Sequence, residues 1–151
     1  MKGTRITIPY HLITDLKFRL ELKFSNLPIN KSNLDSQIFI RKKLIHYLSR
    51  FAILKELNSN YVFDYETDIV EDTLIKSNGN LYRVYGYALN TEFIYIDKEV
   101  NNVRYVFLRF GSDLRSAQII SEISYYDLLN RFDIDREEKN QRIQVSKLEV
   151  I

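Results

Sequence analysis

The first part of the chain repeats apolar side chains at the spacing of amphipathic helices. After Pro9, which suits the first position of a helix, one apolar stripe recurs every three or four residues: Leu12, Ile13, Leu16, Leu20 and Phe24. Residues 16–24 also alternate apolar and polar side chains with a period of two, which is typical of a half-buried strand. Periodicity leaves both structures open for this segment, and we predict a helix.

A second helical pattern follows, and its apolar face is broader. Residues 32–35 supply side chains that can cap the start of a helix. The apolar face then comprises Ile38, Leu44, Ile45, Leu48, Phe51 and Ala52. The other side carries basic residues on neighbouring turns, namely Lys42, Lys43, His46 and Arg50.

Beyond residue 69 the pattern changes to short runs of β-branched and aromatic residues punctuated by turns. Asn78 and Gly79 are a strong hairpin signal because both residues accept a positive φ. Strands are predicted at residues 6–8, 69–76, 81–89, 93–96, 103–110 and 117–123, with an edge strand within 142–151. A short helix is predicted at residues 125–132, and a charged surface connection at 133–141.

These elements predict one α+β domain over residues 1–151, with a helical part at 1–58 and a mostly β part at 59–151. We expect two N-terminal helices packed on a mostly antiparallel sheet of five or six strands. Within 103–110, the face formed by Arg104, Val106, Leu108 and Phe110 is the more continuously apolar. We expect that face to pack on the helices.

Composition narrows the class of protein. The chain has 151 residues, of which 45% are hydrophobic, with only four glycines and two prolines, which is typical of a packed domain. Cysteine is absent, so disulfides and thiolate metal sites are excluded. Neither a signal peptide nor a membrane-spanning run is present, and we expect a cytoplasmic protein without a membrane partner.

The net charge of +2 hides a segregated distribution. Residues 1–55 hold 11 basic and 3 acidic residues, residues 56–99 hold 3 and 9, and the rest hold 8 of each. Such segregation indicates a basic face for an acidic partner, two parts of one fold that attract each other, or a face shared between protomers. The attraction within one fold is the simplest of these interpretations.

Several runs resemble the DUF1822 family, a domain of unknown function found mainly in cyanobacteria. They are the amphipathic helix at 38–53, Asp68-Ile69-Val70, the hairpin at 78–84, and the runs at 99–106 and 113–120. The chain departs from the family at Ser121 and Glu122, where a Gly-Phe pair is common, and it is shorter than many members. The resemblance implies a fold and a cyanobacterial source for a short member or an excised domain, and it implies no activity.

No catalytic, metal or cofactor site is predicted. The two histidines, His11 and His46, lack the spacing of metal ligands, and the four glycines are isolated, so no phosphate-binding loop is present. Carboxylates gather at Asp64, Glu66, Asp68, Glu71 and Asp72. If extended, residues 64, 66 and 68 would point to one side and suit Mg²⁺ or Ca²⁺, or a solvated edge. We favour the solvated or ion-paired edge.

Two surfaces are candidates for binding. Arg41, Lys42, Lys43, His46 and Arg50 offer a basic helix face to an acidic partner or to nucleic acid phosphates. Tyrosines recur across the predicted strands, where they suit either a protein interface or ordinary cross-strand packing: Tyr82, Tyr85, Tyr87, Tyr95 and Tyr105. The leading prediction is a non-enzymatic adaptor or scaffold domain that binds a protein or a second copy. A nucleic-acid-binding accessory protein is the alternative, and a metal-dependent enzyme using residues 64–72 is the weaker one.

Overall fold

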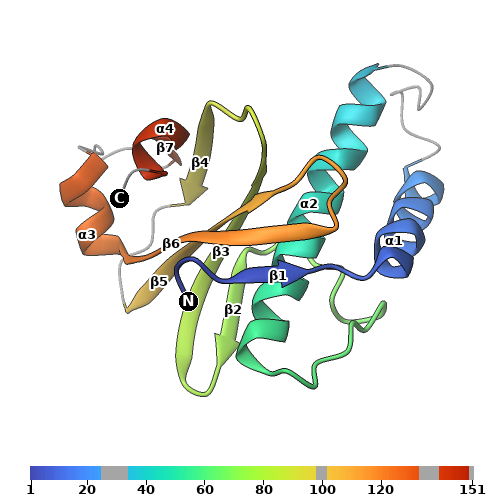
Figure 1. The fold of residues 1–151 in the computed structure, drawn as a ribbon, viewed down its shortest axis with the longest axis horizontal. Helices are drawn as coiled ribbons and strands as arrows, with labels where there is room; N and C mark the ends of the chain where they lie inside the picture. The colour runs from blue at the N-terminus through green and yellow to red at the C-terminus, as the bar shows by residue number, and fades with distance from the viewer. Residues whose placement is uncertain (25–33, 98–101, 133–139, 150–151) are drawn as a thin grey trace.

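The computed structural model describes residues 1–24, 34–97, 102–132 and 140–149. Figure 1 shows the described elements, which in chain order are β1 (Arg5–Thr7), α1 (Tyr10–Lys23), α2 (Leu34–Leu57), β2 (Leu74–Ser77), β3 (Asn80–Ala88), β4 (Phe93–Asp97), β5 (Val103–Phe110), β6 (Ser116–Ser124), α3 (Tyr125–Phe132), β7 (Asn140–Gln144) and α4 (Val145–Leu148). The α+β class with two N-terminal helices is confirmed.

The main sheet has five strands in the order β1-β6-β5-β3-β2. Its neighbours are antiparallel except for β3 and β5, which run parallel. A parallel pair needs a crossover connection, and residues 89–102 provide it and contain β4. β4 pairs with β7 in a separate two-stranded antiparallel sheet.

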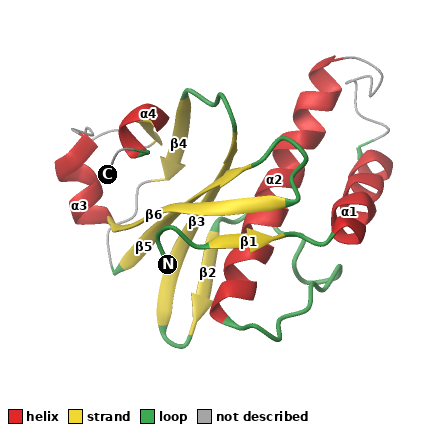
Figure 2. Ribbon diagram, in the orientation of Figure 1, coloured by secondary structure: helices red, strands yellow, loops and turns green. Residues whose placement is uncertain are grey.

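Both faces of the main sheet are covered (Figure 2). α2 packs on one face with α1 beside it, and Val106, Leu108 and Phe110 of β5 join this helical core, as predicted. The other face is buried under β4, β7, α3 and α4, where Tyr105 and Phe107 belong to a second core. A strand buried on both sides explains why β5 carries apolar or aromatic residues at nearly every position.

Several local predictions are confirmed. Residues 16–24 are helical through Lys23, the end of α1, and residues 125–132 form α3. The hairpin forms at Asn78 and Gly79, which have φ values of 50° and 81°, although β2 begins at Leu74 rather than at residue 69. The predicted caps at residues 32 and 33 and most of the charged connection at 133–141 lie outside the described residues.

Two strand predictions are wrong. Residues 93–96 do not extend the main sheet, because β4 alternates buried Ile94 and Ile96 with exposed Tyr95 and Asp97. Such a one-sided strand suits a covering layer better than a sheet buried on both faces. The C-terminal run is not one edge strand either. β7 pairs with β4, and α4 follows it, burying Val145 and Leu148 at helical spacing.

α2 approaches the sheet closely at Gly86 of β3. A Cβ on Gly86 would lie 1.8 Å from Ser49 Oγ and 3.0 Å from side-chain atoms of Ile45 and Phe110. Ser49 Oγ itself donates to the carbonyl of Ile45, at 2.6 Å. Gly86 and Ser49 are therefore a pair of small residues that sets the distance between α2 and β3.

We expect Gly86→Ala to lower the free energy of unfolding by about 1–3 kcal/mol, because the added methyl overpacks this contact. Adding Ser49→Ala should recover part of the loss, since it removes the nearest atom. Urea unfolding of both single variants and the double variant measures the coupling. Gly111→Ala, whose Cβ would lie 3.3 Å from Ser116 Oγ, is the matched control and should cost less. An equal loss at both glycines would contradict the close approach.

Candidate functional site

The connection between α2 and β2, residues 58–73, runs back along the helix. Near its start, the rings of Tyr61 and Phe63 pack against Phe51 at centroid distances of 6.4 and 6.2 Å. Further on, Val70 and Glu71 lie beside earlier turns of α2. The acidic third of the chain therefore lies against the basic helix, as the interpretation of two mutually attracting parts predicts.

Glu71 is held by two side chains of α2. Lys43 Nζ donates to Glu71 Oε2 and Tyr47 Oη donates to Glu71 Oε1, each at 2.5 Å. Burial favours the neutral carboxyl group, but these two donors outweigh it and hold the pKa of Glu71 below its usual value. Burial, with the Glu71 carboxylate adding to it, raises the pKa of Tyr47. Lys43 is therefore engaged in an ion pair with another residue of the same chain.

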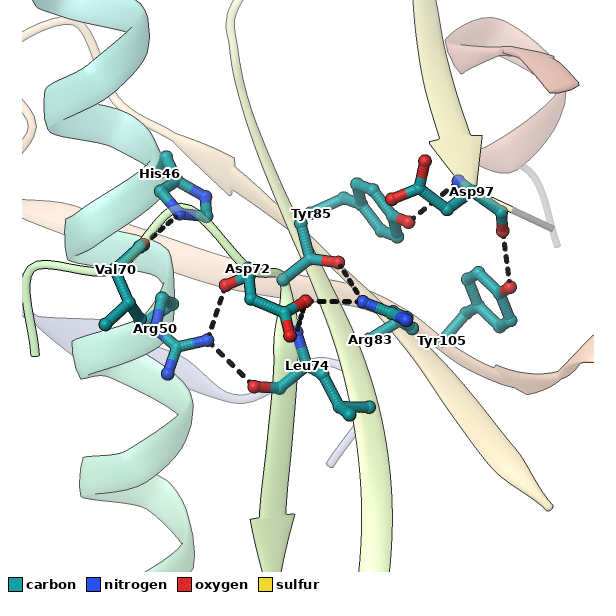
Figure 3. Close-up of polar contacts among 10 residues, drawn as sticks. His46, Arg50, Val70, Asp72, Leu74, Arg83, Tyr85, Asp97 and Tyr105 are labelled. Atoms are coloured by element: carbon teal, nitrogen blue, oxygen red, sulfur yellow. Dashed lines mark hydrogen bonds and ion pairs between the residues drawn. The ribbon is translucent and has the colours of Figure 1, made fainter. Parts of the chain in front are cut away.

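Arg50 binds the backbone where the connection enters β2. Its Nη1 donates to the carbonyl of Asp72 at 2.6 Å and to that of Leu74 at 2.9 Å (Figure 3). The Asp72 carboxylate accepts from Arg83 Nη1 of β3 at 2.6 Å and from the Leu74 amide at 3.0 Å. One arginine of α2 and one of β3 thus fix the start of β2 from both sides.

His46 is the third basic residue of α2 that contacts the connection between α2 and β2. Its Nε2 lies 2.8 Å from the carbonyl of Val70, so a hydrogen bond requires the proton on that nitrogen. Burial lowers the pKa of His46, although the carbonyl and Glu71 favour the charged form. We call Lys43, His46 and Arg50 with their partners in residues 70–74 the helix clamp.

The remaining basic candidates lie outside the helix clamp. Arg41 donates from Nη2 to the carbonyl of Ser112, at 2.9 Å, in the turn between β5 and β6. Lys42 is exposed, and within the described parts of the chain its side chain has no ion pair or hydrogen bond. The predicted basic face is thus mostly engaged by the chain itself, and Lys42 is the member that remains available.

The tyrosine candidates divide in the same way. Tyr82, Tyr85, Tyr87 and Tyr105 are buried, so they pack across strands rather than present a tyrosine surface. Tyr85 Oη accepts from the Asp97 amide at 3.0 Å, and Tyr105 Oη donates to the Asp97 carbonyl at 2.8 Å (Figure 3). The two rings stack on each other, and their hydroxyl groups attach the end of β4 to the main sheet. Tyr95 is 65% exposed.

The acidic cluster does not form a row of carboxylates. The chain turns between Asp64 and Asp68, whose amide donates to the Asp64 carbonyl at 2.8 Å, so the extended geometry considered for residues 64–68 is wrong. Asp68 is buried, and its carboxylate accepts from Tyr61 Oη and from the Asp64 amide. In the described ranges, three or more potential metal ligands do not converge anywhere.

Lys42 and Tyr95 both line an open groove of about 380 Å³. α2 supplies one wall, β4 supplies the other, and the end of β3 lies between them. Its lining residues are Ile38, Arg41, Lys42, Ile45, Tyr85, Gly86, Tyr87, Ala88, Thr91, Phe93, Ile94 and Tyr95. We call this the α2–β4 groove. Ile38 is 44% exposed at its rim, and none of the lining residues is acidic.

The groove was not predicted from the sequence, because residues 93–96 were expected to extend the main sheet. The one-sided alternation of residues 93–97 was the available signal, since it marks a strand that covers a face. Comparisons with protein-family models, curated proteins and solved structures find no match to this chain. Within the described residues, none of the helices has the length and apolar character needed to cross a membrane.

We expect Arg50→Gln to lower the free energy of unfolding by about 1–3 kcal/mol, because two backbone carbonyls lose their donor. Lys42→Gln removes the same charge from the same helix and should change it by less than about 0.5 kcal/mol. Urea unfolding monitored by circular dichroism compares the two. Equal effects would show that the helix clamp does not stabilise the fold.

Stability should depend on pH through His46. The pKa of His46 in the folded state lies below the ordinary value of 6.5, so as the pH falls below about 6.5 the unfolded chain takes up a proton that the folded chain resists. The free energy of unfolding should therefore fall from pH 7.5 to pH 5.5. His46→Gln should flatten this dependence, whereas His11→Gln at an exposed position should keep it. Unchanged pH dependence in the His46 variant would contradict the assignment.

Proposed function

We propose that the chain is a non-enzymatic protein-binding domain of the adaptor or scaffold type, and that the α2–β4 groove is its binding surface. The observation that carries the proposal is the groove itself. It is open, mostly apolar and lined by the exposed side chains of Lys42 and Tyr95, while the other predicted binding residues are engaged within the fold. Resemblance to the DUF1822 family stays a prediction and adds no activity.

The composition of the groove favours a protein over other ligands. Ile38 and Tyr95 expose apolar and aromatic surface at its rim, and tyrosine is enriched among residues that dominate binding at protein interfaces. Lys42 supplies one cation at the edge of the groove. An ion pair between Lys42 and a carboxylate of the partner would increase the selectivity of binding more than its affinity. A volume near 380 Å³ accommodates a few side chains of a partner.

Nucleic-acid binding has less support from the geometry. Lys43, His46 and Arg50 contact the connection between α2 and β2, so they are not presented as a row to phosphates. Binding to nucleic acid grows with the number of phosphate contacts, and within the predicted basic face of α2 the described contacts leave Lys42 available for one. The metal-dependent enzyme is likewise not favoured, because the Asp68 carboxylate is occupied by protein donors.

We expect Tyr95→Ser to weaken binding of a protein partner by at least about tenfold, because an exposed aromatic side chain at the rim of a groove is a typical hot spot. Proteins retained from an extract of the native host by the wild-type chain are identified and then purified. Their dissociation constants are measured for the wild type, Tyr95→Ser and Ile38→Asp. Tyr126→Ser, at a position 68% exposed outside the groove, is the matched control.

The same variants test self-association. If the partner is a second copy, sedimentation of the wild type shows a dimer that Tyr95→Ser dissociates and Tyr126→Ser retains. A partner or dimer that both groove variants bind as tightly as the wild type would exclude the α2–β4 groove as the binding surface.

A further inference from the structure

β3 is paired along only part of one edge. On the side of β2, the register covers Asn80 to Arg83, and the Val84 amide adds a bond to the Thr73 carbonyl at 3.0 Å. On the side of β5, pairing continues from Leu81 to Ala88. Among the described residues, the last four of β3, 85–88, therefore have a neighbouring strand on one side only. Figure 1 shows β3 continuing beyond the first residue of β2, Leu74.

The direction of the backbone groups on this edge follows from Val84. Its N–H points toward β2, and successive residues of a strand direct their N–H and C=O groups to alternate edges. The N–H and C=O groups of Gly86 and Ala88 must then point to the same edge of the strand as those of Val84, at positions beyond the first residue of β2. The Ala88 carbonyl accepts from the Thr91 amide at 3.3 Å. For the other outward groups of these two residues, the described residues provide no partner strand.

This free edge lies inside the α2–β4 groove. α2 covers one face of the sheet here, where Gly86 packs against Ser49 and Ile45. β4 covers the opposite face, where Asp97 binds Tyr85 and Tyr105. The groove opens between these two layers, in line with β2. A further strand in that position would continue the sheet and be enclosed on both faces.

We propose that the α2–β4 groove binds an extended segment of a partner protein by adding it as a strand to the free edge of β3. The inference rests on the proposed function and specifies its binding mode. Backbone hydrogen bonds to Gly86 and Ala88 provide affinity, and side chains that alternate toward the two walls provide selectivity.

The walls define the chemistry of the bound segment. Side chains on one face meet Ile38 and Ile45 of α2, and those on the other meet Phe93 and Tyr95 of β4. We therefore expect apolar side chains on both faces of the segment. Lys42 and Arg41 line the α2 wall and no acidic residue lines the groove, so a carboxylate on the face toward α2 complements it.

The test uses a designed peptide, acetyl-Asp-Val-Ile-Thr-Asp-Val-Ile-Thr-amide, with acidic and apolar residues on one face. Binding is measured by NMR titration of the full chain, followed by amide hydrogen exchange. We expect the Gly86 and Ala88 amides to exchange at least about tenfold more slowly with the peptide bound. The Tyr85 and Tyr87 amides face β5 and serve as internal controls whose exchange is unchanged.

Two N-methylated forms of the peptide separate strand addition from contact by side chains alone. One is methylated at the Asp and Ile nitrogens, and the other at the Val and Thr nitrogens. Because a strand directs alternate amides to opposite edges, one form should lose binding and the other should retain it. The role of charge is tested with Lys42→Glu. This substitution should weaken binding of the acidic peptide by up to about fivefold and strengthen binding of a peptide with Lys in place of Asp.

Each contrary outcome has a distinct meaning. Binding without protection of Gly86 and Ala88, or equal binding of both methylated forms, overturns strand addition and leaves the groove as a binding surface. Failure of the peptide to bind at millimolar concentration overturns the stated peptide chemistry, while the groove variants still test the proposed function. Protection of both amides in the free chain shows that the edge is occupied by the chain itself or by a second copy, which also overturns the proposal.

Discussion

The constraint on which the structure depends is the hydrogen bonding of backbone carbonyls where the connection after α2 enters the sheet. The carbonyls of Val70, Asp72 and Leu74 meet side chains of α2 rather than another strand. Unpaired carbonyls in such a half-buried position are costly, and His46 and Arg50 supply the donors. The helix clamp thereby sets where β2 begins, and so how much of β3 the hairpin covers.

The same constraint determines which surfaces are available for binding. Because the helix clamp uses Lys43, His46 and Arg50, most of the predicted basic face of α2 is engaged within the fold. Because β2 begins only at Leu74, the last residues of β3 lack a neighbour on that side. The tyrosine hydroxyls hold β4 over the opposite face at Asp97. An exposed edge is normally short or covered, and here it lies at the bottom of an apolar groove.

The sequence was sufficient for most of the local elements and for the class of fold. Helical spacing identified α2, and Asn78 with Gly79 identified the hairpin, because both signals depend on residues close in the chain. The pairing of β4 with β7 was not predictable in this way, since it joins segments more than forty residues apart through the shared burial of Ile94 and Ile143. Likewise, the polar side of α2 was identified correctly, but periodicity does not reveal whether such a side faces water or another part of the chain. Tyr85 and Tyr105 illustrate the same limit, because a tyrosine in a strand suits a buried hydrogen bond as well as an interface.

The side-chain ¹⁵N–¹H NMR spectrum near neutral pH tests the helix clamp most directly. We expect the His46 Nε2 proton and the Arg50 Nη protons to exchange slowly with water, and His46 to be fixed in the tautomer protonated at Nε2, because carbonyls of the connection hold these donors. Exchange as fast as that of exposed His11, together with averaged tautomers at His46, would show that the helix clamp does not hold these donors.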